Sequence, residues 1–208
     1  MTKVITIGRQ YGSAGHDIGE IIARELGYTL YDKQLVEMAA KNNNISPEAL
    51  KHVDEKATTS LLYSLASGSY SVRGMSGPLY YEMPINDKLF LAQSEVIKKV
   101  AADEDCVIIG RCSDYVLEDV EDIDLTNVFI YAPTDWRAQR VADAYGLSPR
   151  KAKDRVNKTD KQRKTYYSYY ANRTWGAIEN YDICINSQKT GIERAAKIII
   201  DYIRGIQE

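Results

Sequence analysis

The sequence has few cysteines, no long apolar run and almost no net charge, and each absence excludes a class of protein. Its 3 cysteines form no Cys-x-x-Cys pair, so we expect buried, reduced thiols rather than a metal site or disulfides. The sequence has no run of about 18 apolar residues, so we expect no membrane span. Because a strand pattern starts within a few residues of Met1, we also expect no signal peptide. The formal net charge of -2 argues against a general nucleic-acid binder. We expect one substantial core in a cytoplasmic protein of 208 residues.

The stretch from Val4 to Gly27 has the order strand, glycine-rich loop, helix. Val4, Ile5 and Ile7 predict a buried strand, and residues 8–15 a loop. The apolar face of the following helix is then Ile18, Ile21, Ile22 and Leu26. Glycines let backbone N–H groups surround phosphate oxygens, and a helix N-terminus adds partial positive charge at the same place. Phosphate is therefore the expected ligand of this loop.

The loop departs from the P-loop motif G-x-x-x-x-G-K-[ST]. When Gly15 is aligned with the second glycine, Gln10, His16 and Asp17 stand at the other fixed positions. The pattern alone leaves two interpretations open: a phosphate site, or a glycine-rich turn needed only for packing. The residues that favour phosphate binding are the glycines and the possible donors: Arg9, Gly12, Ser13 and Gly15.

Strand and helix patterns alternate along the rest of the chain. Apolar runs predict further strands at 28–31, 106–109, 125–131 and 181–186. Helical spacing lies between them, and Gly27 and Gly146 are expected to end two of the helices. This order predicts a parallel sheet with helices on both faces. Arg111 follows one strand, and because ligands bind at the carboxyl ends of parallel strands, we expect Arg111 to project toward the loop. The alternative is a solvated arginine in a turn.

The segment 150–173 is basic and rich in tyrosine. Nine Lys and Arg residues occur in this range, and four tyrosines lie within 166–170. Such a run is often only a solvated helix face. In a chain of net negative charge we favour an anionic partner for it.

Several local patterns together resemble the cytidylate kinase-like family, a branch of the nucleoside monophosphate kinases with a modified P-loop. They are Gly8-Arg-Gln-Tyr-Gly-Ser-Ala-Gly-His-Asp-Ile-Gly19, Tyr31-Asp-Lys33, Val107-Ile-Ile-Gly-Arg-Cys112, Asp160-Lys-Gln-Arg163 and Asn180-Tyr-Asp-Ile-Cys-Ile-Asn186. The resemblance spans nearly the whole chain, and the combined spacing is more specific than any single pattern.

The resemblance implies an α/β fold of the P-loop NTPase type, a three-layer sandwich with a mostly parallel sheet and helices on both faces. It implies a single domain over 1–208, with a helical substrate-binding insertion at about 45–95 and a short lid at about 148–173. The donor phosphates of ATP would be bound by Arg9, Gly12, Ser13, Ala14, Gly15, His16 and Asp17. The catalytic arginines would be Arg111, Arg155 and Arg163. The acceptor would be bound by Asp32, Arg73, Gln93, Arg111 and Asp160. The cofactors would be ATP and Mg²⁺, with the metal ligand left open.

Three functions remain open at this point. The first is ATP-dependent phosphoryl transfer to a small acceptor, with CMP or dCMP favoured by the resemblance alone. The second is a catalytically impaired nucleotide sensor, because His16 cannot simply replace the P-loop lysine; in an active enzyme Arg9 or a lid arginine would supply the missing charge. The third, which net charge disfavours, is single-stranded nucleic-acid binding by the tyrosines at 166–170. We expect small-molecule nucleotides as partners and leave open a homo-oligomer formed through residues 61–91.

Overall fold

A five-stranded sheet with the strand order β2-β3-β1-β4-β5 forms the centre of the molecule. The computed structural model describes residues 1–42 and 85–205. All four strand pairings are parallel, which confirms the sheet predicted from the alternating pattern. The strands are β1 (Thr2–Arg9), β2 (Thr29–Tyr31), β3 (Cys106–Ile109), β4 (Ile123–Tyr131) and β5 (Ile183–Asn186).

Helices connect successive strands. They are α1 (Gly15–Leu26), α2 (Gln34–Asn42), α5 (Ile85–Asp103), α6 (Ser113–Val116), α7 (Thr134–Tyr145), α8 (Pro149–Ala171), the 3-10 turn η1 (Ile178–Asn180), α9 (Ser187–Thr190) and α10 (Ile192–Gly205). Gly27 ends α1 with φ 72°, and Gly146 ends α7 with φ 61°, as predicted. Both positions need the left-handed conformation that glycine adopts without strain. Thr190 is the last residue of α9, and α10 begins two residues later at Ile192.

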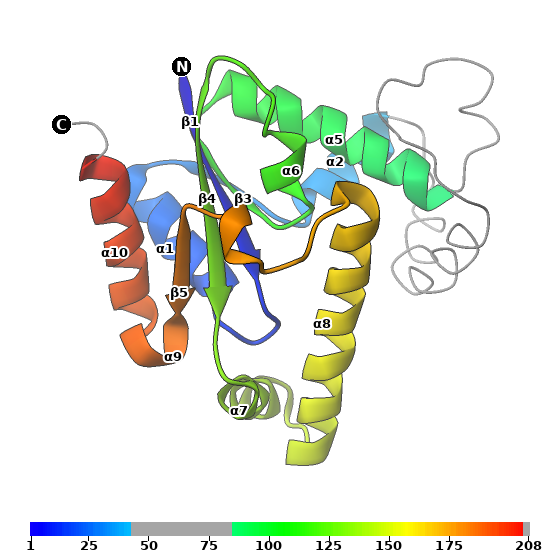
Figure 1. Ribbon diagram of the computed structural model, residues 1–208, viewed down its shortest axis with the longest axis vertical. Coiled ribbons are helices and arrows are strands. Elements are labelled where there is room, and N and C mark those ends of the chain that lie inside the picture. Colours follow the sequence, from blue (N-terminus) through cyan, green and yellow to red (C-terminus); the bar gives the residue numbers. More distant parts are fainter. Residues whose placement is uncertain (43–84, 206–208) are drawn as a thin grey trace.

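Two hydrophobic clusters cover the two faces of the sheet. Alternate residues of one strand point to opposite faces, so Val4 belongs to the cluster with α2, α5 and the end of α8. Ile5 and Ile7 belong to the cluster with α1 and α10. Figure 1 shows the resulting three layers, with α1 and α10 on one side of the strands and α5 and α6 on the other. The three-layer P-loop fold expected from the sequence is confirmed.

The carboxyl ends of the strands bring the predicted site residues to one edge of the sheet. In Figure 1 the arrowheads of β1 and β4 point toward α7, while both chain termini lie at the opposite end. Ile7 pairs with Ile109 across β1 and β3, so Arg9 and Arg111, two residues further along each chain, follow the same edge. Tyr31 pairs with Ile108, which brings the end of β2 to this edge as well.

The helix α8 covers most of the expected lid, 148–173. Its C-terminal end is part of the core, because Tyr167 and Tyr170 are buried and pack with Phe90 of α5. The rings of Phe90 and Tyr170 stack at 4.0 Å between centroids. Two of the four tyrosines that a nucleic-acid platform would need therefore face the interior.

Part of the expected insertion falls outside the described residues. Of the range 45–95, the structure describes only 85–95, which begin α5. Arg73 and most of 61–91 lie outside it, so their predicted roles stay predictions. None of the helices within residues 1–42 and 85–205 is long and apolar enough to cross a membrane.

Candidate functional site

The loop between β1 and α1 ends at a helix start whose first backbone N–H groups have no acceptor within the helix. Gly12 has φ 80°, and a Cβ at this position would lie 2.9 Å from the backbone oxygen of Arg137. Ala14 adopts a left-handed conformation immediately before α1. The first hydrogen bond of the helix runs from Ile18 N–H to Ala14 O at 3.0 Å. The N–H groups of the first three helical residues, 15–17, have no acceptor within the helix and can bind an anion.

Ser13 holds the loop together from the inside. Its side chain is fully buried, and its hydroxyl donates to the backbone oxygens of Gln10 at 2.8 Å and Ile130 at 3.0 Å. Its own N–H donates to Gln10 O, and Ser13 O accepts from the Ser187 hydroxyl at 2.7 Å. These contacts differ from the prediction that Ser13 donates to phosphate, because burial turns its donors toward the protein.

Arg137 and Asp160 fasten the outer side of the loop to α7 and α8. Asp160 accepts from Tyr11 N–H at 2.7 Å and from Arg137 Nη1 at 2.6 Å. Arg137 also donates to Tyr11 O and to Ala132 O, and only 5% of its side chain is exposed. Both carboxylate oxygens of Asp160 are therefore engaged within the protein, which differs from its predicted contact with substrate. The role of Arg137 was not predicted from the sequence, because its burial depends on the packing of α7 against α8.

Three arginines gather where β1, β3 and α8 meet. Arg163 donates from Nη1 to Arg9 O at 2.8 Å. Burial, followed by the charges of Arg163 and Arg111, lowers the pKa of Arg9 to about 9. Burial also lowers the pKa of Arg163, against the opposing effect of Asp160 and Asp32. Like charges held together away from water are costly unless an anion accompanies them, so this cluster fits a phosphate ligand.

Arg155 lies at the outer rim of the same loop. Its guanidinium carbon is 4.0 Å from the ring centroid of Tyr145 and 5.8 Å from that of Tyr11. Arg163 approaches the same Tyr11 ring at 5.5 Å. The two arginines predicted for the lid therefore flank one aromatic residue of the loop, which supports their assignment to one site.

The residues at the P-loop lysine and hydroxyl positions are engaged by charged neighbours. His16 Nε2 lies 3.4 Å from Asp32 Oδ2, and His16 Nδ1 lies 3.6 Å from Glu20 Oε1. Asp17 pairs with Arg140 at 2.7 Å. Asp17 therefore joins the start of α1 to α7 through its ion pair with Arg140, a contact that the sequence did not indicate.

Gln93 was predicted to bind the phosphoryl acceptor, and its surroundings give a chemical reason for such binding. The residue is 3% exposed, and its Oε1 has no hydrogen-bond donor in the described chain. Asn86 Oδ1, seven residues earlier on α5, is buried without a donor in the same way. Residues seven apart lie on one helix face. Buried carbonyl oxygens without donors are rare in folded proteins and suit the hydroxyl or amino groups of a ligand.

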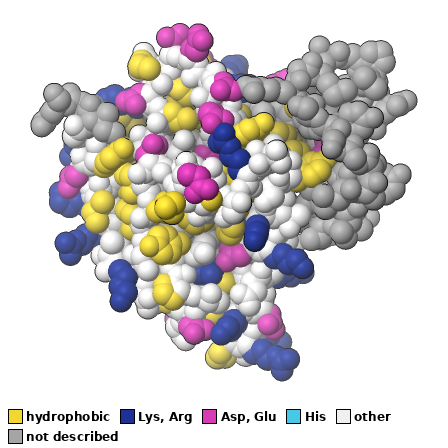
Figure 2. All heavy atoms as spheres, in the orientation of Figure 1, with side chains coloured by type: hydrophobic (Ala, Val, Ile, Leu, Met, Phe, Trp, Pro, Cys, Tyr) yellow, Lys and Arg dark blue, Asp and Glu magenta, His cyan; other side chains and the backbone are white. Residues whose placement is uncertain are grey.

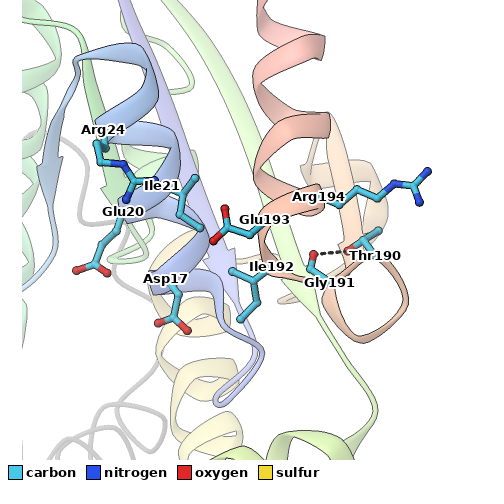
Figure 3. Close-up of a pocket in the computed structure, with 9 residues that line it drawn as sticks. All are labelled: Asp17, Glu20, Ile21, Arg24, Thr190, Gly191, Ile192, Glu193 and Arg194. Atoms are coloured by element: carbon cyan, nitrogen blue, oxygen red, sulfur yellow. Dashed lines mark hydrogen bonds between the residues drawn. The ribbon is translucent and has the colours of Figure 1, made fainter.

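An open pocket of about 700 Å³ lies beside the loop, between α1 and the turn that joins α9 to α10. Figure 3 shows Asp17 and Ile21 on the α1 side, with Ile192 and Glu193 projecting from the opposite side. The pocket begins at the helix start that carries the anion-binding N–H groups. Its two isoleucines give it an apolar wall, which the phosphate-binding part of the site lacks.

Most of the predicted basic segment is a solvated surface. Apart from Arg155 and Arg163, several of its cations are exposed, and Lys153 and Arg173 pair with Asp135 and Glu118. On the face drawn in Figure 2, Lys and Arg side chains are interspersed with Asp and Glu. That face does not carry the continuous basic stripe that a nucleic-acid backbone requires.

The sequence and fold have relatives among known proteins. The model of the cytidylate kinase-like family matches residues 4–189. A comparison with curated proteins finds no match. An uncharacterized protein from Eubacterium ventriosum ATCC 27560 is similar, with a TM-score of 0.71 and 26% identity over 98% of this chain and 99% of that chain.

Two kinases of known structure share the fold. Shikimate kinase from Bacteroides thetaiotaomicron matches with a TM-score of 0.55 and 11% identity, over 97% of this chain and 98% of that chain. A gluconokinase from Sinorhizobium meliloti 1021 matches with a TM-score of 0.51 and 14% identity, over 99% of this chain and 97% of that chain. At such identities the likeness concerns the fold alone.

Proposed function

The chain belongs to the cytidylate kinase-like family, and we propose that it transfers the γ-phosphoryl group of ATP to a small acceptor, CMP or dCMP by the family resemblance. The observation that carries this proposal is the cluster of Arg9, Arg111 and Arg163 beside the start of α1: Arg163 donates to Arg9 O at 2.8 Å, and the Arg9 side chain lies against Gly15. A cluster of cations at a helix N-terminus is suited to an oligophosphate.

Phosphoryl transfer requires positioning and charge neutralisation more than covalent help from the protein. The N–H groups of residues 15–17 bind the donor phosphates, and Arg111 holds the transferred group from the end of β3. Arg155 and Arg163 bind it from α8 and exclude water. The bond between the γ-phosphorus and the bridging oxygen breaks, that oxygen leaves with ADP, and the acceptor oxygen forms the new bond.

Magnesium would neutralise the oxygens of the donor phosphates. In the described part of the chain no three His, Cys, Asp or Glu side chains form a preformed metal site. Kinase sites usually hold Mg²⁺ through one or two carboxylates, with phosphates and water completing its shell. Asp17 fits this requirement, because it lies in the first turn of α1 beside the N–H groups that would bind phosphate.

The acceptor and the donor base take separate places in this proposal. Asp32 at the end of β2 and Gln93 on α5 bind the acceptor, whose hydroxyl or amino groups satisfy the free Oε1 of Gln93. The nucleoside part of the donor lies in the pocket between α1 and α10, against Ile21 and Ile192. The start of α1, which would bind the phosphates, lies between the acceptor site and the nucleoside pocket and so aligns the γ-phosphate with the acceptor.

One observation favours a second function. His16 stands where a P-loop kinase has lysine, and its ring nitrogens face Asp32 and Glu20. A protein that binds ATP without transferring phosphate would act as a nucleotide sensor with the same fold.

The test is ADP formation by the purified protein with Mg-ATP and each of CMP, dCMP, UMP, AMP and GMP, alongside shikimate and gluconate as alcohol acceptors. Transfer to one acceptor, lost in Arg111→Ala, would support the kinase and identify its substrate. ATP binding without transfer to any acceptor would contradict the kinase and favour the sensor.

A further inference from the structure

The Arg9 side chain is confined between glycines of two different loops. A Cβ on Gly15 would lie 2.5 Å from Arg9 Cβ, and a Cβ on Gly110 would lie 1.7 Å from Arg9 Nη1. Its stem therefore crosses the start of α1, and its guanidinium reaches the turn after β3. Glycine at both places leaves the room that this side chain occupies. The guanidinium also lies near the first turn of α1, because Arg9 and His16 contact the two oxygens of the same Asp32 carboxylate.

Among the described residues the charge of Arg9 has one ion pair, a weak one with Asp32. The nearest ion-pair contact is Arg9 Nη2 to Asp32 Oδ1 at 3.8 Å, and 18% of the Arg9 side chain is exposed. Arg163 fixes the Arg9 backbone by donating to its carbonyl oxygen at 2.8 Å. Arg9 is thus an ordered, mostly buried cation that is only weakly paired, close to two further arginines.

His16 is not positioned to bind the donor phosphates as a P-loop lysine would. Its side chain is 46% exposed, and its two ring nitrogens face Glu20 and Asp32. Carboxylates on both sides of the ring repel the phosphate groups that a lysine at this position would contact. The positive charge at the loop must come from another residue.

We infer that Arg9 binds the terminal phosphates of the donor. In the P-loop motif a lysine at the start of the helix supplies this positive charge, whereas in this protein it comes from Arg9 at the end of β1, before the loop. This inference rests on the proposed function for the identity of the donor. A guanidinium binds two phosphate oxygens at once through its planar fork. It therefore bridges neighbouring phosphates from the floor of the site, whereas lysine contacts them as a single point of charge.

The experiment measures the affinities of inorganic tripolyphosphate, ATP and AMP by calorimetry, for the wild type and for Arg9→Gln, Arg9→Lys and His16→Ala. The matched control is Arg204→Gln, which removes an exposed arginine from the last turn of α10, outside the pocket. Loss of a charge-assisted, two-pronged contact should weaken tripolyphosphate and ATP by about 10- to 100-fold. Arg9→Lys should recover part of this loss, while Arg204→Gln and His16→Ala should change affinity by less than about threefold.

The outcomes separate the inference from the proposed function. Unchanged tripolyphosphate affinity in a folded Arg9→Gln variant, or a larger loss in His16→Ala, would overturn the role of Arg9 and leave phosphoryl transfer standing. Arg9-dependent tripolyphosphate binding in a wild type that transfers phosphate to no acceptor would keep the anion site and end the kinase proposal. A wild type that binds neither ATP nor tripolyphosphate would overturn both. If Arg9→Gln fails to fold, Arg9→Lys decides the matter through its weaker tripolyphosphate binding.

Discussion

Asp160 Oδ1 accepts a hydrogen bond from Tyr11 N–H at 2.7 Å, although 149 residues separate the two in the chain. The other oxygen of Asp160 pairs with Arg137 at 2.6 Å. Through this carboxylate α8 is attached to the glycine-rich loop. A helix that carries Arg163 into the site is thereby held in register with the loop that would bind the donor.

Asp160→Asn should lower the free energy of unfolding by about 3 kcal/mol, because it leaves the buried Arg137 without its counter-ion. The side-chain oxygen of the asparagine can still accept a hydrogen bond from Tyr11 N–H, so the lost stability measures the ion pair with Arg137. Urea unfolding measures it, with Asp135→Asn as the matched control. Asp135 pairs with Lys153 on the surface, so its loss should lower the free energy of unfolding much less than the loss of Asp160. Equal costs for the two variants would contradict the role assigned to Asp160.

The fold was largely predictable because its signals are local. Apolar runs and helical spacing depend on neighbouring residues, and Gly27 and Gly146 end helices for a conformational reason that acts at a single residue. The place of Arg111 at the carboxyl edge of the sheet could also be predicted, since it follows a buried strand and parallel strands share this edge. Strand bounds were less accurate. β4 begins at Ile123 rather than Leu125, because β1 offers pairing partners down to Thr2.

The inward contacts of the site were not predictable from the sequence. Whether Ser13 turns its hydroxyl to a phosphate or to the carbonyl of Ile130 depends on where β4 passes the loop. The burial of Arg137 depends on how α7 packs against α8, and nothing in the local sequence of α7 marks this arginine as buried. Long-range packing decides such orientations, and spacing within one element does not encode it.

Gln93→Leu should raise stability and weaken acceptor binding together. The buried Oε1 has no donor in the described chain, so a similar apolar side chain removes an unmet desolvation cost of about 1 to 3 kcal/mol. An acceptor that hydrogen-bonds to this oxygen should show a KM at least about tenfold higher. Thermal unfolding and steady-state kinetics measure the two effects, with Gln139→Leu on α7 as the control. A less stable variant with an unchanged KM would show that the amide has a structural role instead.

The Glu104→Gln variant should lose stability at neutral pH but not in acid. Glu104 accepts hydrogen bonds from the hydroxyls of Thr29 and Tyr31, and these bonds hold the pKa of Glu104 below its usual 4.5. Its contribution is therefore complete above pH 4.5 and is lost as the pH falls through the lowered value. The difference in Tm from the wild type should shrink as the pH falls from about 7 to about 3. Glu25→Gln is the exposed control, and a difference independent of pH would contradict the prediction.

Gly110→Ala and Gly146→Ala should cost similar stability but differ in phosphate binding. Gly110 has φ 71° and Gly146 has φ 61°, so each alanine adds a left-handed strain of about 1 to 2 kcal/mol. At Gly146 the added Cβ meets nothing within 4 Å, whereas at Gly110 it meets the far end of the Arg9 side chain. A flexible guanidinium moves aside at little cost in stability, but it then leaves the place from which it would bind phosphate.

Tripolyphosphate affinity should therefore fall in Gly110→Ala by about as much as in Arg9→Gln, roughly 10- to 100-fold, and stay unchanged in Gly146→Ala. Combining Gly110→Ala with Arg9→Gln should add no further loss of affinity, because both changes remove the same contact. Urea unfolding and calorimetry on the four proteins separate strain from binding. Additive losses in the double variant would mean that the turn after β3 binds phosphate on its own, through the backbone of residues 110–112 rather than by making room for Arg9.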